Sequence, residues 1–136
     1  MSHRPYLRPS RAITRILNPL ARTLGLASTL RVQGRKTGKI RQIPVYVLEH
    51  SGERYLVAPR GETEWVRNLR AAGSAEIKTK GRTEVFEPEE VPAEARAPII
   101  DAYLERWGTL VRAPFEELPD PADHPVFRMR PPRAGG

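Results

Sequence analysis

The 136-residue sequence has no cysteine, only three histidines, and no run of about 18 apolar residues. The absence of cysteine excludes disulfides, thiolate chemistry and zinc sites of the cysteine type. His3, His50 and His124 lie far apart in the chain, so we expect no metal site. No membrane-spanning helix is expected either. The N-terminal stretch also lacks the apolar core of a signal peptide, which predicts a cytoplasmic protein.

Positive charge is concentrated in the first half of the chain. Residues 1–70 contain 14 lysines and arginines against four acidic residues, whereas residues 71–136 contain nine against twelve. The first half therefore carries a net charge of +10 and the second half −3, within a total of +7. This asymmetry indicates an anionic partner, and charge alone leaves open a nucleic acid, a membrane surface or a phosphorylated small molecule.

The length suits one domain, since domains commonly contain on the order of 100–150 residues. We predict a flexible arm over residues 1–9, a single domain over residues 10–130 and a flexible tail over residues 131–136. Apolar residues at helical spacing predict an amphipathic helix over residues 10–26, interrupted by Pro19. This helix packs on the core or, through its arginines, lies at the inner face of a membrane as a peripheral contact.

Short segments of alternating or β-branched residues predict an antiparallel sheet, with hairpin turns at Ser51–Gly52 and at Gly81. A proline-rich loop is predicted over residues 114–125. This α+β pattern favours a small barrel of antiparallel strands with flanking helices, because closing the sheet removes its exposed edges. Strands are predicted over residues 28–33, 42–50, 54–58, 75–80, 82–87 and 126–130, and helices over residues 62–72 and from about residue 97.

The segment GRKTGKIR, residues 34–41, joins two of the predicted strands and places four cations within seven residues. Two glycines permit a tight turn with exposed amide groups, and arginine adds bidentate recognition of phosphate or carboxylate. The segment is not a P-loop, because the Lys36–Thr37 pair lacks the preceding glycine spacing and a following helix. Two interpretations of this segment are possible from its residues alone: an anion-binding loop and a solvated basic turn.

Two further segments carry candidate binding residues. The sequence VAPRG, residues 57–61, ends a predicted strand just before a helix, where a flat ligand can approach backbone amides. On that helix, Trp65 is more readily a core residue than a ligand contact, and a buried Asn68 needs hydrogen-bond partners and would brace a neighbouring loop. No nucleophile with a base and no paired carboxylates are evident, so no catalytic residue is assigned, and the chemistry is expected to come from a cofactor.

Three stretches, GRKTGKIRQIPVYVL, GERYLVAPRG and EWVRNLRAAG, occur in an order and spacing that resembles the deazaflavin-dependent nitroreductases and quinone reductases that use coenzyme F420. The resemblance covers residues 30–77 well and residues 84–130 loosely. It implies a split β-barrel related to the flavin-binding split barrels. It also implies that the basic loop holds the phosphate and oligoglutamate tail of the cofactor.

The resemblance assigns each matching residue an expected place. It implies that the cofactor tail is bound by Arg35, Lys36, Thr37 and Arg41. It implies that the residues near the deazaflavin ring are Pro44, Val45, Tyr46, Ala58, Pro59, Arg60 and Gly61, with Trp65 and Asn68 supporting them. The substrate pocket is expected to include Tyr103 and Trp107. The chain departs from the family at Pro59, which has no amide N–H to donate, and in lacking a C-terminal tyrosine cluster.

The function expected from this resemblance is hydride transfer from reduced F420 to a quinone or nitro-type acceptor, in an oxidoreductase. The alternative is a split barrel loaded with flavin mononucleotide, haem or a lipid-like ligand. Nucleic-acid binding is disfavoured, because the basic loop has no interleaved aromatic residues and no nucleic-acid-binding motif is present. A homodimer is left open.

Overall fold

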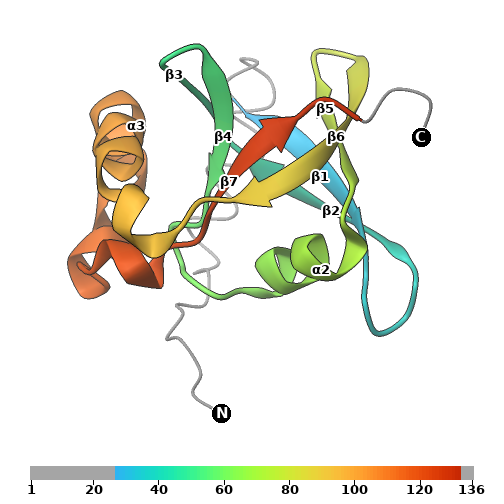
Figure 1. The fold of residues 1–136 in the computed structure, drawn as a ribbon, viewed down its shortest axis with the longest axis horizontal. Helices are drawn as coiled ribbons and strands as arrows, with labels where there is room; N and C mark the ends of the chain where they lie inside the picture. The colour runs from blue at the N-terminus through green and yellow to red at the C-terminus, as the bar shows by residue number, and fades with distance from the viewer. Residues whose placement is uncertain (1–26, 133–136) are drawn as a thin grey trace.

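The computed structural model describes residues 27–132, and the predicted arm and helix over residues 1–26 lie outside this range. The described chain contains seven strands, two α-helices and two short 3₁₀ helices (Figure 1). In chain order these are β1 (Ser28–Gln33), β2 (Ile40–Val45), β3 (Val47–His50), β4 (Glu53–Val57), α2 (Glu64–Ala72), β5 (Ala75–Thr79), β6 (Arg82–Glu90), η1 (Ala93–Ala95), α3 (Ala97–Glu117), η2 (Pro121–Asp123) and β7 (Val126–Arg130).

All seven strands belong to one curled antiparallel sheet with the order β2-β1-β5-β6-β7-β4-β3. The two edge strands, β2 and β3, are consecutive in the chain and are separated only by Tyr46. Since neighbouring Cα atoms lie about 3.8 Å apart, the two edges of the sheet must meet at this residue. The sheet is therefore a barrel that is split between β2 and β3, which confirms the predicted fold class.

Both predicted hairpins are present, and each turn uses two residues in the left-handed region. Ser51 and Gly52 have φ values of 51° and 79°, and Lys80 and Gly81 have values of 50° and 81°. Two successive residues with positive φ form the type I′ turn, whose twist matches that of paired strands. These local signals fix the pairing of β3 with β4 and of β5 with β6.

Strand β6 is longer than predicted and continues through Pro88 to Glu90. Its first part, up to Phe86, pairs with β5, whereas Glu87 to Glu90 pair with β7. At Pro88 the strand has a sheet partner on one side only, so the missing amide N–H interrupts no hydrogen-bond ladder. The prediction that the strand ends before Pro88 was therefore wrong.

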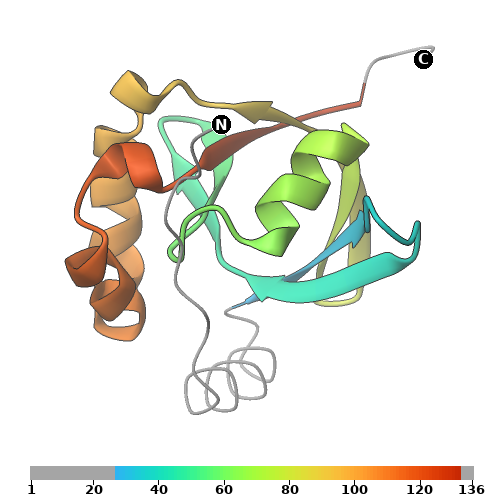
Figure 2. The ribbon, with the colours of Figure 1, turned by 90° about the horizontal axis from the view of Figure 1, so that it is seen from below.

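Two helices cover the barrel in different ways. Helix α2 lies across one end of the barrel, and α3 packs beside β3 and β4 (Figures 1 and 2). One buried cluster, which includes Leu30, Leu56 and Phe127, fills the barrel and packs against α2. A second cluster joins Tyr46, β3 and β4 to the apolar face of α3. Within residues 27–132, no helix is long and apolar enough to cross a membrane.

Two further sequence predictions need correction. The predicted strand over residues 42–50 is divided at Tyr46, where the chain passes from one edge of the sheet to the other. The predicted loop over residues 114–125 is helical up to Glu117 and contains η2. Val111, Phe115 and Leu118 recur every three or four residues and are all buried. Their packing outweighs the interruption at Pro114, because tertiary contacts supply most helix stability.

Candidate functional site

The basic segment between β1 and β2 is a tight turn that is closed by its own backbone. The amide of Gly34 donates to the Lys39 carbonyl at 2.8 Å, and the amide of Gly38 donates to the Gly34 carbonyl at 2.8 Å. The Lys39 amide donates to the Thr37 hydroxyl oxygen at 3.2 Å. These amides are already used, contrary to the expectation that the glycines would expose theirs. A bound anion would therefore be held mainly by side chains.

Arg35 ties this turn to helix α2. Its amide donates to the side-chain oxygen of Asn68 at 3.1 Å, and its guanidinium donates to the same oxygen at 2.8 Å and to Glu64 at 3.0 Å. The hydrogen bond from Arg35 lowers the pKa of Glu64. Asn68 is buried, and it braces the neighbouring loop as expected of a buried amide. Arg35 thus positions the turn while part of its charge is already neutralised.

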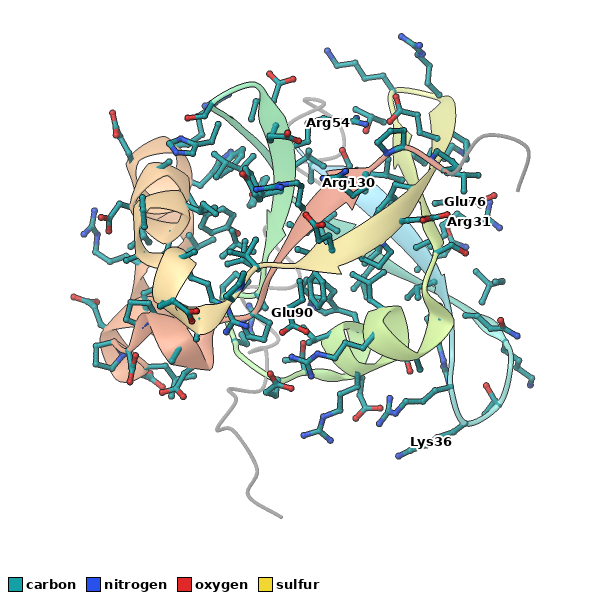
Figure 3. All side chains as sticks on the ribbon, viewed as in Figure 1. Arg31, Lys36, Arg54, Glu76, Glu90 and Arg130 are labelled. Carbon is teal, nitrogen blue, oxygen red and sulfur yellow. The ribbon has the colours of Figure 1, made fainter. Side chains whose placement is uncertain are left out.

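The other cations of this segment differ from Arg35 in having no salt bridge among the described residues. Lys36, Lys39 and Arg41 are exposed, and within residues 27–132 none of their side chains forms a hydrogen bond or a salt bridge. The charge of Lys36 adds to the effect of Arg35 in lowering the pKa of Glu64. Lys36 extends away from the ribbon beside α2 (Figure 3). Two of these cations lie on the turn that Arg35 and Asn68 brace, and Arg41 lies at the start of β2; together they are suited to a polyanionic group.

Residues 58–61, which follow β4, form a second part of the candidate site. The amide of the buried residue Ala58 donates to the Pro125 carbonyl at 2.9 Å, and the Ala58 carbonyl accepts from the Gly61 amide at 3.2 Å. Gly61 is buried with a φ of 83°, a conformation that favours glycine. This turn presents the half-buried Arg60, which has no carboxylate partner among the described residues.

An aromatic cluster lies where the split of the barrel meets α3. The ring of Tyr46 stacks on Trp107 with centroids 5.0 Å apart, and Tyr103 packs against Trp107 at 5.2 Å. Phe115 extends the cluster at 6.0 Å from Tyr103. The Tyr46 hydroxyl and the Trp107 indole nitrogen are buried and have no hydrogen-bond partner within residues 27–132. A buried donor without an acceptor costs about 1–3 kcal/mol, so the cluster holds two unused donors.

Electrostatics link this cluster to Arg60. Burial raises the pKa of both Tyr46 and Tyr103, which keeps the two phenols neutral. The charge of Arg60 acts against this effect at Tyr103. Burial in turn lowers the pKa of Arg60, although its guanidinium remains cationic. A half-buried cation therefore lies near a buried, neutral phenol.

The predicted site residues thus fall into two groups. Arg35, Lys36, Thr37, Arg41 and Asn68 lie at the basic turn, and Trp65 lies on α2 and packs half-buried against the core. Tyr46, Tyr103 and Trp107 come together at the split of the barrel. Pro44 and Val45 end the strand that connects the groups. That strand, β2, spans about 20 Å at about 3.3 Å per residue. The arrangement places exposed cations at one end of β2 and a buried aromatic cluster at the other.

Sequence reasoning missed two residues that shape this surface. His124 is fully buried, and its two ring nitrogens face the carbonyls of Ala58 and Leu118. It thereby connects the strand end before Arg60 to the end of α3. Glu64 is the acidic partner of Arg35. Neither role had a local signal, because Ala58 lies 66 residues from His124 and Arg35 lies 29 residues from Glu64.

A split barrel, a cationic turn braced by Arg35 and Asn68, and an aromatic cluster at the split are features suited to a protein that binds a large organic cofactor. The sequence model of the F420H2-dependent quinone reductase family matches residues 11–112, which is more than half of the chain. The protein belongs to this family, and it is an F420-dependent reductase with coenzyme F420 as its cofactor. A search of curated proteins gives no significant match to the sequence.

Several solved structures share the fold. An F420-H2 dependent reductase (FDR-A) is 21% identical, with a TM-score of 0.58, and the match covers 77% of this chain and 94% of that one. The haem storage protein HutZ of Vibrio cholerae is 12% identical, with a TM-score of 0.60 and coverages of 89% and 92%. A structure described as a domain-swapped dimer is 18% identical, with a TM-score of 0.57 and coverages of 85% and 97%. At these identities the likeness establishes the fold alone.

Proposed function

We propose that this protein reduces a quinone with F420H2, with the cofactor tail on the basic turn and the acceptor against the aromatic cluster. The observation that carries the proposal is that, within residues 27–132, three cations at one end of β2 have no salt bridge and two buried donors at the other end have no acceptor. When bound, F420H2 supplies a hydride and a proton, so that a quinone becomes a hydroquinone and oxidised F420 remains. The protein contributes binding and orientation.

At the tail end, Lys36, Lys39 and Arg41 would contact phosphate and carboxylate groups. Their proposed role rests on their exposure and lack of partners within the described residues. Arg35 would contribute mainly by fixing the turn, because Glu64 and Asn68 already occupy its guanidinium. Thr37 keeps a hydroxyl hydrogen that can still be donated to an anion.

At the ring end, the Arg60 turn and Tyr46 would bound the deazaflavin, and Tyr103 and Trp107 would bound the acceptor. The flat faces of these side chains suit a planar ligand. The unpartnered donors of Tyr46 and Trp107 suit an oxygen that gains charge as the hydride arrives. Pro59 offers no amide, so a backbone contact to the cofactor at that position is not part of the proposal.

The proposal is tested by following F420H2 oxidation with a naphthoquinone, with a nitroaromatic compound as the comparison acceptor. We expect reduction of the quinone, and we expect Tyr46→Phe to lower kcat/KM about tenfold while F420 affinity is unchanged. Tyr55→Phe is the matched control, because Tyr55 belongs to the same buried cluster and its hydroxyl contacts Arg128 instead.

Different failures have different meanings. Failure of F420 to bind more tightly than about 1 mM would overturn the whole proposal. Tighter binding of flavin mononucleotide than of F420 would replace the cofactor. Reduction of the nitroaromatic compound alone would replace the acceptor and leave the cofactor site intact.

A further inference from the structure

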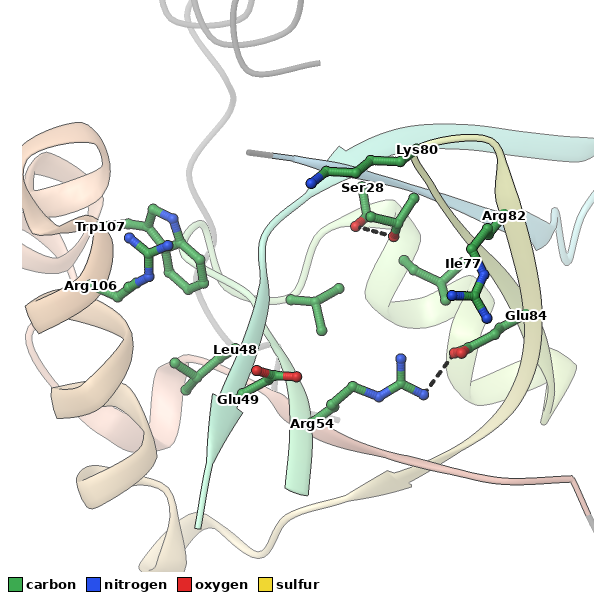
Figure 4. Close-up of a pocket in the computed structure, with 12 residues that line it drawn as sticks. Ser28, Leu48, Glu49, Arg54, Ile77, Lys80, Arg82, Glu84, Arg106 and Trp107 are labelled. Atoms are coloured by element: carbon green, nitrogen blue, oxygen red, sulfur yellow. Dashed lines mark hydrogen bonds and ion pairs between the residues drawn. The ribbon is translucent and has the colours of Figure 1, made fainter. Parts of the chain in front are cut away.

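A pocket of about 540 Å³ opens at the end of the barrel away from the basic turn. It is lined from β1, β3, β4, β5, β6 and α3, together with the β5–β6 turn (Figure 4). Arg54 at this pocket and Lys36 at the basic turn lie toward opposite ends of the molecule in Figure 3. Of the residues assigned above to the cofactor and acceptor, only Trp107 also lines this pocket.

One part of the pocket wall is apolar. Leu48 and Ile77 are buried side chains from opposite sides of the barrel, and the half-buried Val47 adjoins them. Trp107 closes the side formed by α3, where the guanidinium of Arg106 lies 5.3 Å from its ring centroid. A pocket of this size with apolar and aromatic walls is in the range that encloses a small organic molecule.

The rim of the pocket is charged, with an excess of cations. Arg54 and Glu84 neutralise each other at 2.7 Å. Within residues 27–132, the other three cations of the lining, Lys80, Arg82 and Arg106, have no carboxylate partner. The charged lining residues are Arg54, Lys80, Arg82, Arg106, Glu49 and Glu84, which gives the pocket a net charge of +2.

Cations at the rim and apolar side chains in the wall favour a ligand that has both an anionic group and an apolar part. A purely polar polyanion would make no apolar contact with the wall formed by the half-buried Val47 and its neighbours, and a purely apolar molecule would leave the cations without a partner. We propose that this pocket binds an amphiphilic organic anion, a carboxylate or phosphate on an apolar body, as a second site separate from the F420 site. The source is a free organic acid or an anionic lipid. The inference does not depend on the proposed acceptor.

Trp107 provides a direct readout, since Trp65→Phe leaves it as the only tryptophan. Decanoate, decanol and vesicles of phosphatidylglycerol or phosphatidylcholine are titrated against its fluorescence, and calorimetry with the unsubstituted protein repeats the decanoate titration. We expect saturable binding of decanoate and at least tenfold weaker binding of decanol, a difference of about 1.4 kcal/mol. A response to phosphatidylglycerol vesicles but not to decanoate would assign the same anion chemistry to a lipid surface.

A pair of charge reversals locates the binding. Arg82→Glu on the rim should weaken decanoate binding about tenfold, which corresponds to about 1.4 kcal/mol. Lys78→Glu makes the same change of charge next to the pocket-lining residues Ile77 and Thr79, and should have little effect because side chains alternate across a strand.

Three outcomes would overturn the proposal: no saturable binding of decanoate or anionic vesicles, equal effects of the two reversals, or displacement of decanoate by F420. The last outcome would make the pocket part of the cofactor site. Failure of F420 itself to bind would leave this inference standing, since its ligand and its readout are separate.

Discussion

Two groups of cations flank α2, and they differ in whether they have partners. On one side, Arg70 donates to both oxygens of Glu62 at 2.6 and 2.8 Å and to both oxygens of Glu90 at 2.7 Å. Arg96 also reaches Glu90, at 3.1 Å. On the other side, the basic turn carries Lys36, Lys39 and Arg41, which have no such partners within the described residues.

This difference separates two uses of positive charge. The paired group joins α2 to β6 and to the segment before α3, so its cost of desolvation is offset within the folded protein. The side chains of the unpaired group form no salt bridge within residues 27–132 and are available to a ligand. Substitutions in the first group should therefore lower stability and spare F420 affinity, and substitutions in the second group should do the reverse.

The largest expected effect is that of Arg96→Met. The Arg96 side chain is buried, and it donates to the Val91 carbonyl at 2.9 Å, to the Ala122 carbonyl at 3.1 Å and to Glu90. Removing it leaves buried acceptors unsatisfied and should lower the free energy of unfolding by about 3 kcal/mol. Urea denaturation measures this change. A loss below about 1 kcal/mol would contradict the role assigned to the paired group.

Asn68→Ala should lower both the stability of the protein and its affinity for F420. It removes the acceptor shared by the amide and the guanidinium of Arg35, and should lower the free energy of unfolding by about 2 kcal/mol. Because the basic turn then loses its attachment to α2, F420 affinity should fall as well, as calorimetry can measure. Loss of stability with unchanged affinity would show that the turn does not need this brace to bind the cofactor.

Arg70→Met should lower the free energy of unfolding by about 1.5 kcal/mol at pH 7, a modest value because Arg70 is partly exposed. The hydrogen bond from Arg70 lowers the pKa of Glu62 in the folded protein. The stabilising contribution of this ion pair is thus complete above the ordinary glutamate pKa of about 4.3. It is lost as the pH falls through the lower pKa that Glu62 has in the folded protein. The difference between Arg70→Met and wild type should shrink in urea denaturation at pH 3. A difference that is constant with pH would contradict this ion-pair origin.

Much of the fold could be predicted from the sequence where the signals are local. The strands over residues 28–33 and 126–130 have the predicted bounds, and the helix over residues 62–72 begins only two residues later than predicted. Gly73 ends that helix in the left-handed conformation, as expected. The family and its cofactor were also correctly predicted, because the motifs that carry the resemblance are contiguous.

The remaining features depend on contacts between distant segments. The break at Tyr46 follows from closing the sheet, and the helix beyond Pro114 follows from the burial of Phe115. The partners of Arg35 lie 29 and 33 residues later in the chain. No spacing in the sequence distinguishes this restrained arginine from the unpaired Lys36. The direct contacts of these residues with F420 stay predictions.

The most direct test of the comparison is the dissociation constant of F420 for Lys36→Ala, with Lys78→Ala as the matched control. Both substitutions remove one exposed lysine, one at the basic turn and one on β5. We predict that Lys36→Ala weakens binding about fivefold, which is about 1 kcal/mol, and leaves the free energy of unfolding unchanged. Lys78→Ala should change neither quantity. Equal F420 affinity in wild type and Lys36→Ala, or an equal loss in both variants, would contradict the account.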